Sequence, residues 1–321
     1  MKPGLIRTIN VLLTTLIVAA YVPAHAQRNI SDTRRNDRRG VRAVTIPVTL
    51  RLREPRPQSE MQSIEYLTVM EDGEEQEILS LRGGIRSPLS LAILIQEDLV
   101  PSFGNEISGL ADFIRRLPQG SRVFIGYLRS GTIQVRQRFT GDLERAAKSL
   151  RITISSASFA PYNPYVPTIE ALKRFESQPT GRRAVLLISD GVDVSRGVSV
   201  SSPAQSLDLQ RAINEALRRS VAVYSIYVPT VGGTGTGGSL LVGNGQGALE
   251  RLSSETGGRA FFQGLSAPVS FNPFLRELNL LLSRQFALTY LSTHPGKGLH
   301  RIKIVSAVSE GEIQYPQEYT R

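Results

Sequence analysis

The central part of the chain alternates short apolar runs with segments whose apolar residues recur every three or four positions. Nearly continuous apolar runs are typical of strands covered by helices on both faces, and the second pattern is typical of amphipathic helices. The predicted strands span residues 90–95, 122–128, 182–189 and 221–228, and the predicted helices include residues 105–117, 168–175 and 204–220. This alternation predicts an α/β fold with a doubly wound, mostly parallel sheet.

Both ends of the chain carry a different pattern, in which apolar and polar residues alternate one by one. Such alternation is typical of strands with one buried face. One run precedes residue 54, two runs flank the turn Glu71-Asp72-Gly73, and three runs follow residue 285. Because neither end is large enough to bury its apolar face alone, we expect both ends to pack together as a small flanking β layer. The predicted boundaries are 44–85 for the N-terminal β segment, 86–284 for the α/β domain and 285–321 for the C-terminal β segment.

The first 26 residues have the form of a secretory signal peptide. Lys2 and Arg7 form a positive start, an apolar stretch follows, and Ala24-His25-Ala26 is a small-x-small cleavage signal. A membrane anchor is the alternative, but the apolar stretch is shorter than the roughly 20 residues that span a bilayer. We therefore expect an exported protein, periplasmic or secreted, with no membrane span after cleavage. Residues 27–43 are rich in Arg without an apolar period, which predicts a disordered basic leader.

The composition excludes some kinds of chemistry. The 321 residues contain no Cys, so disulfides, thiolate metal sites and cysteine nucleophiles are absent. The formal net charge is +10, but outside the leader the basic residues are scattered along the chain. A scattered charge of this kind does not favour a nucleic-acid partner.

A Gly-rich stretch, residues 229–247, lies between a predicted strand and a predicted helix. Such a position invites comparison with phosphate-binding loops, which place glycines before a helix. The stretch contains no G-x-x-x-x-G-K-[ST] motif and no basic residue. It is therefore predicted to be a surface loop.

Three segments of the chain carry a family resemblance: YLTVMEDGEEQEILSL from residue 66, AVLLISDGVDVSRG from residue 184 and GALERLSSETGGRAFF from residue 247. They resemble segments of the acidobacterial family of exported proteins related to von Willebrand factor A. The resemblance covers nearly the whole chain after residue 43. It implies an A-type α/β domain with a β attachment, and it implies no established reaction.

The resemblance also implies a divalent-cation site where the strands of the sheet end. A-type domains usually form it from Asp-x-Ser-x-Ser, a Thr of a later loop and an Asp after the fourth strand. This chain keeps the last residue as Asp190, but the first set reads Gln96, Asp98 and Val100, and the Thr position falls at residues 166–168. A neutral amide is a weak ligand for magnesium and valine is none, so we predict a degenerate site with no cofactor.

Two alternatives for these acidic residues remain open. Asp98, Ser102, Asp190 and Asp193 are candidates for a rebuilt site that holds one cation, Ca²⁺ or Mg²⁺. Asp190 is also explained by turn formation alone, because an Asp-Gly pair after a strand is a stable turn.

The favoured function is a non-catalytic interaction module that binds an envelope or extracellular protein or a glycan. The candidate contact residues lie in three loops at the strand ends: Gln96, Glu97, Asp98, Tyr162, Tyr165, Asp190, Asp193 and Arg196. The tyrosines serve either as interface anchors or as covers of the sheet. A hydrolase of unknown type is the remaining alternative. His294 and His300 lie in the last predicted hairpin, far in sequence from Ser102 and Ser189, and His294 is predicted on the surface.

We predict cleavage between Ala26 and Gln27, because Ala-His-Ala follows an apolar stretch of suitable length. The intact mass of the exported protein measures the cleavage site directly. A mature protein that retains Lys2 and Arg7 would contradict the prediction.

Overall fold

The computed structural model describes residues 41–52, 67–84, 87–231, 238–264, 266–306 and 311–320. The predicted signal peptide and residues 27–40 of the predicted leader lie outside these residues. The described residues form two sheets, one mostly parallel and one antiparallel. The predicted fold class is therefore confirmed. No helix among the described residues is long and apolar enough to cross a membrane.

The first sheet is doubly wound, with the order β6-β5-β4-β7-β8-β9 in the described chain. Its strands are β4 (Ser90–Gln96), β5 (Arg122–Arg129), β6 (Thr132–Thr140), β7 (Arg183–Ser189), β8 (Ala222–Tyr227) and β9 (Ala260–Phe261). All neighbours are parallel except β5 and β6, which form an antiparallel pair. The chain first adds β5 and β6 on one side of β4, and then β7, β8 and β9 on the other side. The winding direction therefore reverses between β4 and β7.

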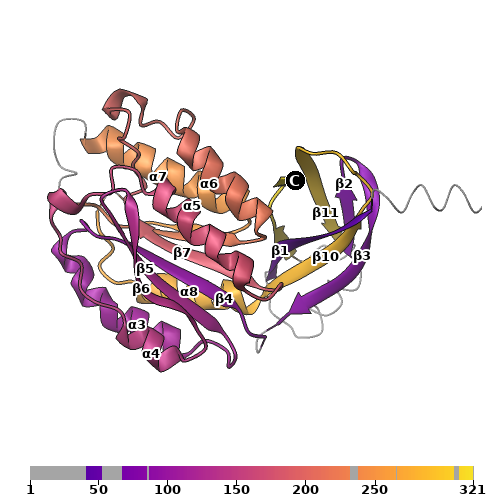
Figure 1. The fold of residues 1–321 in the computed structure, drawn as a ribbon, viewed down its shortest axis with the longest axis horizontal. Coiled ribbons are helices and arrows are strands. Elements are labelled where there is room, and N and C mark those ends of the chain that lie inside the picture. Colours follow the sequence, from indigo (N-terminus) through magenta and orange to yellow (C-terminus); the bar gives the residue numbers. More distant parts are fainter. Residues whose placement is uncertain are drawn as a thin grey trace, which may run out of the picture. The chain divides into compact units, whose positions relative to one another are not determined.

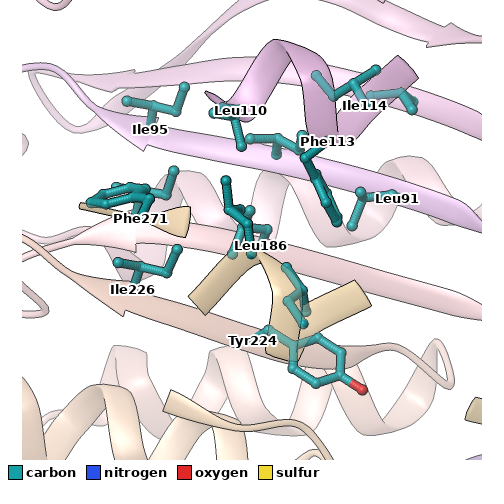
Figure 2. Close-up of a cluster of buried hydrophobic side chains, with 14 of the residues drawn as sticks. Leu91, Ile95, Leu110, Phe113, Ile114, Leu186, Tyr224, Ile226 and Phe271 are labelled. Carbon is teal, nitrogen blue, oxygen red and sulfur yellow. The ribbon is translucent and has the colours of Figure 1, made fainter. Parts of the chain in front are cut away.

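Helices cover both faces of this sheet (Figure 1). On one face lie α3 (Ile107–Arg115), α4 (Leu143–Lys148) and α8 (Asn272–Ser283), and on the other α5 (Tyr165–Lys173), α6 (Leu207–Arg218) and α7 (Gly238–Glu255). Short 3₁₀ helices are η1 (Pro101–Glu106), η2 (Ala157–Phe159), η3 (Arg174–Ser177) and η4 (Val198–Val200). Successive residues of β4 alternate between the two apolar cores. Figure 2 shows Leu91 and Ile95 of β4 in the core beside Leu110 and Phe113 of α3.

The second sheet joins strands from both ends of the described chain, in the order β12-β1-β10-β3-β2-β11-β13. The strands are β1 (Arg42–Leu52), β2 (Leu67–Glu71), β3 (Glu74–Gly83), β10 (Gln285–Ser292), β11 (Leu299–Ser306), β12 (Gly311–Gln314) and β13 (Glu318–Thr320). Strand β10 pairs with β1 on one side and with β3 on the other. The expectation that the chain ends form one β layer is therefore confirmed.

Arg182 lies at the junction of the two sheets. Its buried guanidinium donates hydrogen bonds to the carbonyls of Gly84 and Ser87, which lead into β4, and of Leu282, near the end of α8. Burial lowers the pKa of Arg182 to about 10. The guanidinium thus fixes the segments by which the chain passes between the sheets.

Helix α7 corrects one prediction, because it begins at Gly238, inside the Gly-rich stretch assigned to a surface loop. Residues 232–237 of that stretch lie outside the described residues. The low helix propensity of glycine predicts a loop, but close packing decides otherwise. A Cβ atom at Gly245 would overlap the carbonyl oxygen of Asp190. Glycine therefore lets the helix lie directly against the loop that follows β7. Helix α5 likewise begins at Tyr165, three residues before the predicted start.

A charged cluster at one end of the antiparallel sheet contains both described histidines. The carboxylate of Glu71 is buried, and its oxygens lie 3.6 Å from Nδ1 of His294 and 3.8 Å from Nδ1 of His300. Nδ1 of His300 also lies 2.7 Å from Oδ2 of Asp72. His294, predicted on the surface, is 23% exposed at its side chain. The hydrogen bond between His300 and Asp72 raises the pKa of the imidazole and lowers the pKa of the carboxyl.

These shifts predict that Asp72→Asn destabilises the protein most at about pH 5.5. The stabilisation from His300 is complete below the imidazole's unfolded pKa and is lost as pH rises through the folded pKa. The stabilisation from Asp72 is lost only as pH falls through its lowered pKa. Asn keeps the acceptor for the Arg301 amide and tolerates the left-handed backbone at this position. We expect a loss of roughly 1 kcal/mol, since the carboxylate is partly exposed.

Denaturant unfolding at about pH 5.5 and about pH 9 measures the difference. Glu75→Gln, an exposed change on the same hairpin, is the control. A loss of equal size at both pH values would show that the imidazole and carboxylate charges do not contribute.

Candidate functional site

The candidate site lies where β4 and β7 end, at the reversal of the winding direction. In open α/β sheets, ligands bind at the carboxyl ends of the strands at this point. The two strands are paired in parallel from Ser90 and Arg183 to Ile95 and Ile188. This register carries Gln96 and Ser189 to the same edge of the sheet.

The amide of Gln96 joins the ends of β4 and β7. Its Oε1 accepts hydrogen bonds from the Ser189 hydroxyl and from the backbone N–H of Asp190, and its Nε2 donates to Oδ1 of Asp98 at 3.0 Å. The N–H of Asp190 is only a donor, so the amide oxygen faces Asp190 and the NH₂ group faces Asp98. The Ser189 hydroxyl in turn accepts from the Gly191 N–H. Each group therefore donates to the next in one direction, from the Gly191 N–H through Ser189 and Gln96 to Asp98.

Two carboxyl groups lie beside this amide. Asp98 is 4% exposed, and its side chain hydrogen-bonds only Gln96 among the other described residues. Asp190 is partly buried, accepts from the Val192 N–H and lies 3.3 Å from the Thr230 hydroxyl. Burial raises the pKa of Asp98, and burial together with the charge of Asp98 raises the pKa of Asp190 to about 7. A negative charge on either carboxyl group is therefore unfavourable at this site.

A cleft of about 620 Å³ opens above these carboxyl groups. Its floor includes Gln96, Asp98 and Asp190, and its polar wall adds Ser102, Thr230 and Ser266. The rest of the wall is mainly apolar: Val100, Ala157, Ala160, Pro161, Tyr162, Val192, Val194, Tyr227, Pro229, Leu241, Val242 and Ala267. No Lys, Arg or His lines the cleft in the part of the chain that the structure describes. The site is thus an acidic floor within apolar walls.

Glu97, a candidate contact residue, points away from the cleft. Its carboxylate is fully buried, receives two hydrogen bonds from the Arg151 guanidinium at 2.8 and 2.6 Å, and accepts the Ile154 N–H. The hydrogen bond with Glu97 raises the pKa of Arg151. Glu97 therefore holds residues 151–155 against the end of β4.

The two tyrosine candidates have opposite environments. Tyr162 is 59% exposed and lines the cleft. Tyr165 is fully buried, and its hydroxyl donates to the Gly191 carbonyl at 2.6 Å. Of the two roles predicted for these side chains, Tyr162 has the position of an interface anchor and Tyr165 covers the sheet.

The remaining candidates do not join the floor. Asp193 accepts hydrogen bonds from the hydroxyls of Ser195 and Ser206, and it connects the loop after β7 to the start of α6. Arg196 is exposed and makes no ion pair with Asp98 or Asp190 in the described chain. Thr168 is buried and donates to the Pro164 carbonyl within its own helix.

Sequence reasoning missed the contribution of the segment after β8. Thr230 approaches Asp190 because residues 98–100 pair with residues 229–231. Leu241 and Val242 reach the cleft because α7 begins early. The position of Thr230 just beyond a buried strand was the one usable signal, since parallel strands end at the same edge.

The described residues do not fit the cation that A-type domains hold. A hard cation requires several converging oxygen ligands. Here the NH₂ group of Gln96 is directed at Asp98, Thr168 is bonded within its helix, and Asp193 is bonded to serines. Within the described ranges, no group of three or more His, Cys, Asp or Glu is arranged to hold a metal.

The chain is similar to known proteins in structure. No protein-family model and no curated protein matches the chain. Among solved structures, the chain is similar to the hypothetical protein BatB from Bacteroides thetaiotaomicron (13% identity over 61% of this chain and 97% of that one, TM-score 0.42). It is also similar to a von Willebrand factor type A protein from Catenulispora acidiphila (10% identity over 87% of this chain and 72% of that one, TM-score 0.42). A third similar structure is that of the manganese-loaded TRAP protein from Plasmodium vivax (12% identity over 74% of this chain and 96% of that one, TM-score 0.40).

The raised pKa of Asp190 predicts that Asp190→Asn stabilises the protein above about pH 7. Between the ordinary carboxyl pKa of 3.8 and about 7, the folded state binds more protons than the unfolded state, so stability falls as pH rises. Asn removes this loss and retains an acceptor for the Val192 N–H. We expect a gain on the order of 2 kcal/mol at about pH 8, which disappears below about pH 4.

Thermal and denaturant unfolding across this range measure the effect. Asp112→Asn, on the exposed surface of α3, is the matched control. A variant that is less stable than the wild type at about pH 8 would contradict the predicted cost of the Asp190 charge.

Proposed function

We propose that this chain is an exported interaction module, which binds a protein or glycan through the cleft without a divalent cation and without catalysis. The single observation that carries the proposal is the Gln96 amide, whose donor group is bonded to Asp98 where a metal ligand would be required. The site is thus a degenerate form of the A-type cation site, set in an otherwise intact cleft.

The geometry supports a cation-free site in one further way. Val100 lines the cleft with a side chain that offers no ligand atom. Binding through such a site depends on shape, apolar contact and hydrogen bonding.

A binding role also agrees better with the site than hydrolysis does. The Ser189 hydroxyl is fully buried and donates to Gln96, so it is not activated as a nucleophile. The described histidines belong to β11 and the turn before it, and neither lines the cleft. The exposed Tyr162 at the rim instead provides the type of side chain that anchors interfaces.

We predict that magnesium, calcium and manganese at millimolar concentration give no saturable heat in calorimetric titration of the wild type. The positive control is the triple variant Gln96→Asp, Asp98→Ser, Val100→Ser, which restores Asp-x-Ser-x-Ser and should gain cation binding. Saturation of the wild type at one ion per chain, abolished by Asp190→Ala, would establish a rebuilt cation site instead.

Partner binding is tested by capture from the native envelope with the wild type as bait. Retention should be unaffected by chelator and lost in Leu241→Glu, which places a charge in the apolar wall. Leu280→Glu, on the exposed side of α8, is the control that should retain the partner. Equal capture by both variants would exclude the cleft as the contact surface.

A further inference from the structure

The carboxyl groups of the cleft differ from the other buried acids of the described chain. Glu97 has Arg151, Glu215 has Arg218 and Arg219, and Glu71 has two imidazoles. Asp193 is bonded to two serine hydroxyls. Asp98, by contrast, has one neutral amide as its partner, and its second carboxylate oxygen accepts no hydrogen bond from another described residue. A nearly buried acceptor is therefore left open toward the cleft.

A second carboxyl group lies at the same floor. Asp190 lines the cleft beside Asp98, and no described basic side chain lines the cleft to neutralise either charge. Burying charged acids without a cation is unfavourable, which agrees with the raised pKa values of both groups. A bound positive charge would remove this cost.

The walls determine what kind of positive charge fits. The space of about 620 Å³ is lined by Val192, Val194, Leu241 and Val242, which suit an aliphatic chain rather than a hydrated ion. A primary ammonium group carries three donors of its own and binds single acceptors without fixed coordination geometry. Its aliphatic stem packs on apolar surface while the charged end reaches a polar site.

We infer that the cleft binds the side chain of a lysine from a partner protein, with the ammonium group between Asp98 and Asp190 and the stem along the apolar walls. This inference rests on the proposed function, because it names the group that the interaction module recognises. The bound group then has the opposite charge to the ligand of a cation site. The partner supplies a positive charge here, whereas a metal-bearing site would attract a carboxylate. The exposed ring of Tyr162 at the rim then contacts residues next to the inserted lysine.

The test uses n-pentylammonium as a probe of the lysine side chain and n-pentanol as its uncharged counterpart. Methyl chemical shifts of Val192 and Leu241 report entry into the cleft. We expect saturable shifts with n-pentylammonium in the millimolar range and binding of n-pentanol weaker by about tenfold. Equal binding of the two probes, or no binding of n-pentylammonium, would overturn the inference.

Variants make the result specific to the floor. Asp98→Asn should remove the preference for the charged probe, and Asp112→Asn should preserve it. Since burial of the Asp98 charge is unfavourable, Asp98→Asn should not unfold the protein, and its melting temperature verifies this. A preference retained in folded Asp98→Asn would contradict the inference, as would binding of n-pentylguanidinium that is about tenfold tighter than that of n-pentylammonium.

The failure of this inference is distinguishable from the failure of the proposed function. If partner capture is lost in Leu241→Glu while n-pentylammonium does not bind, the cleft is an interaction site for a group other than lysine. If capture is equal in Leu241→Glu and Leu280→Glu, the proposed function fails whatever the probe does.

Discussion

The buried guanidinium of Arg182 is the interaction on which the arrangement of both sheets depends. It stands directly before β7 and donates to carbonyls that precede β4 and β10. The Arg182 carbonyl also accepts the Ser90 N–H, which sets the first residues of β4 beside those of β7. Because this register is kept along both strands, Gln96 meets Ser189 at the opposite edge. The amino ends of the strands thus determine the geometry of the site at their carboxyl ends.

Backbone N–H groups, which can only donate, fix the direction of the hydrogen bonds at the floor of the cleft. Backbone N–H groups of Asp190 and Gly191 orient Gln96 and Ser189, and the Gln96 amide then orients toward Asp98. The Gln96 amide therefore offers hydrogens at a position where a carboxylate would attract a positive ion, while the carboxyl groups of Asp98 and Asp190 lie beside it. The proposed lysine side chain would offset the cost of these two carboxyl charges.

Part of this arrangement was readable from the sequence and part was not. Apolar runs predicted the strands of the central sheet, because burial on both faces leaves few polar positions. The weakness of Gln96 and Val100 as ligands followed from their side chains alone. The partnership of Glu97 with Arg151, 54 positions later, depends on loop packing that no local pattern reports. The early start of α7 was hidden for a related reason, since glycine predicts a loop unless close approach of two backbones requires it.

The position of β10 has a consequence for the timing of folding. Thr45 in β1 pairs with Thr289 in β10, 244 positions later, and β3 pairs with the other edge of the same strand. The antiparallel sheet is therefore incomplete until almost the whole chain has been synthesised, and closing so long a loop makes its assembly slow. During that interval β1 and β3 expose unpaired edges, which are sites for chaperone binding or aggregation.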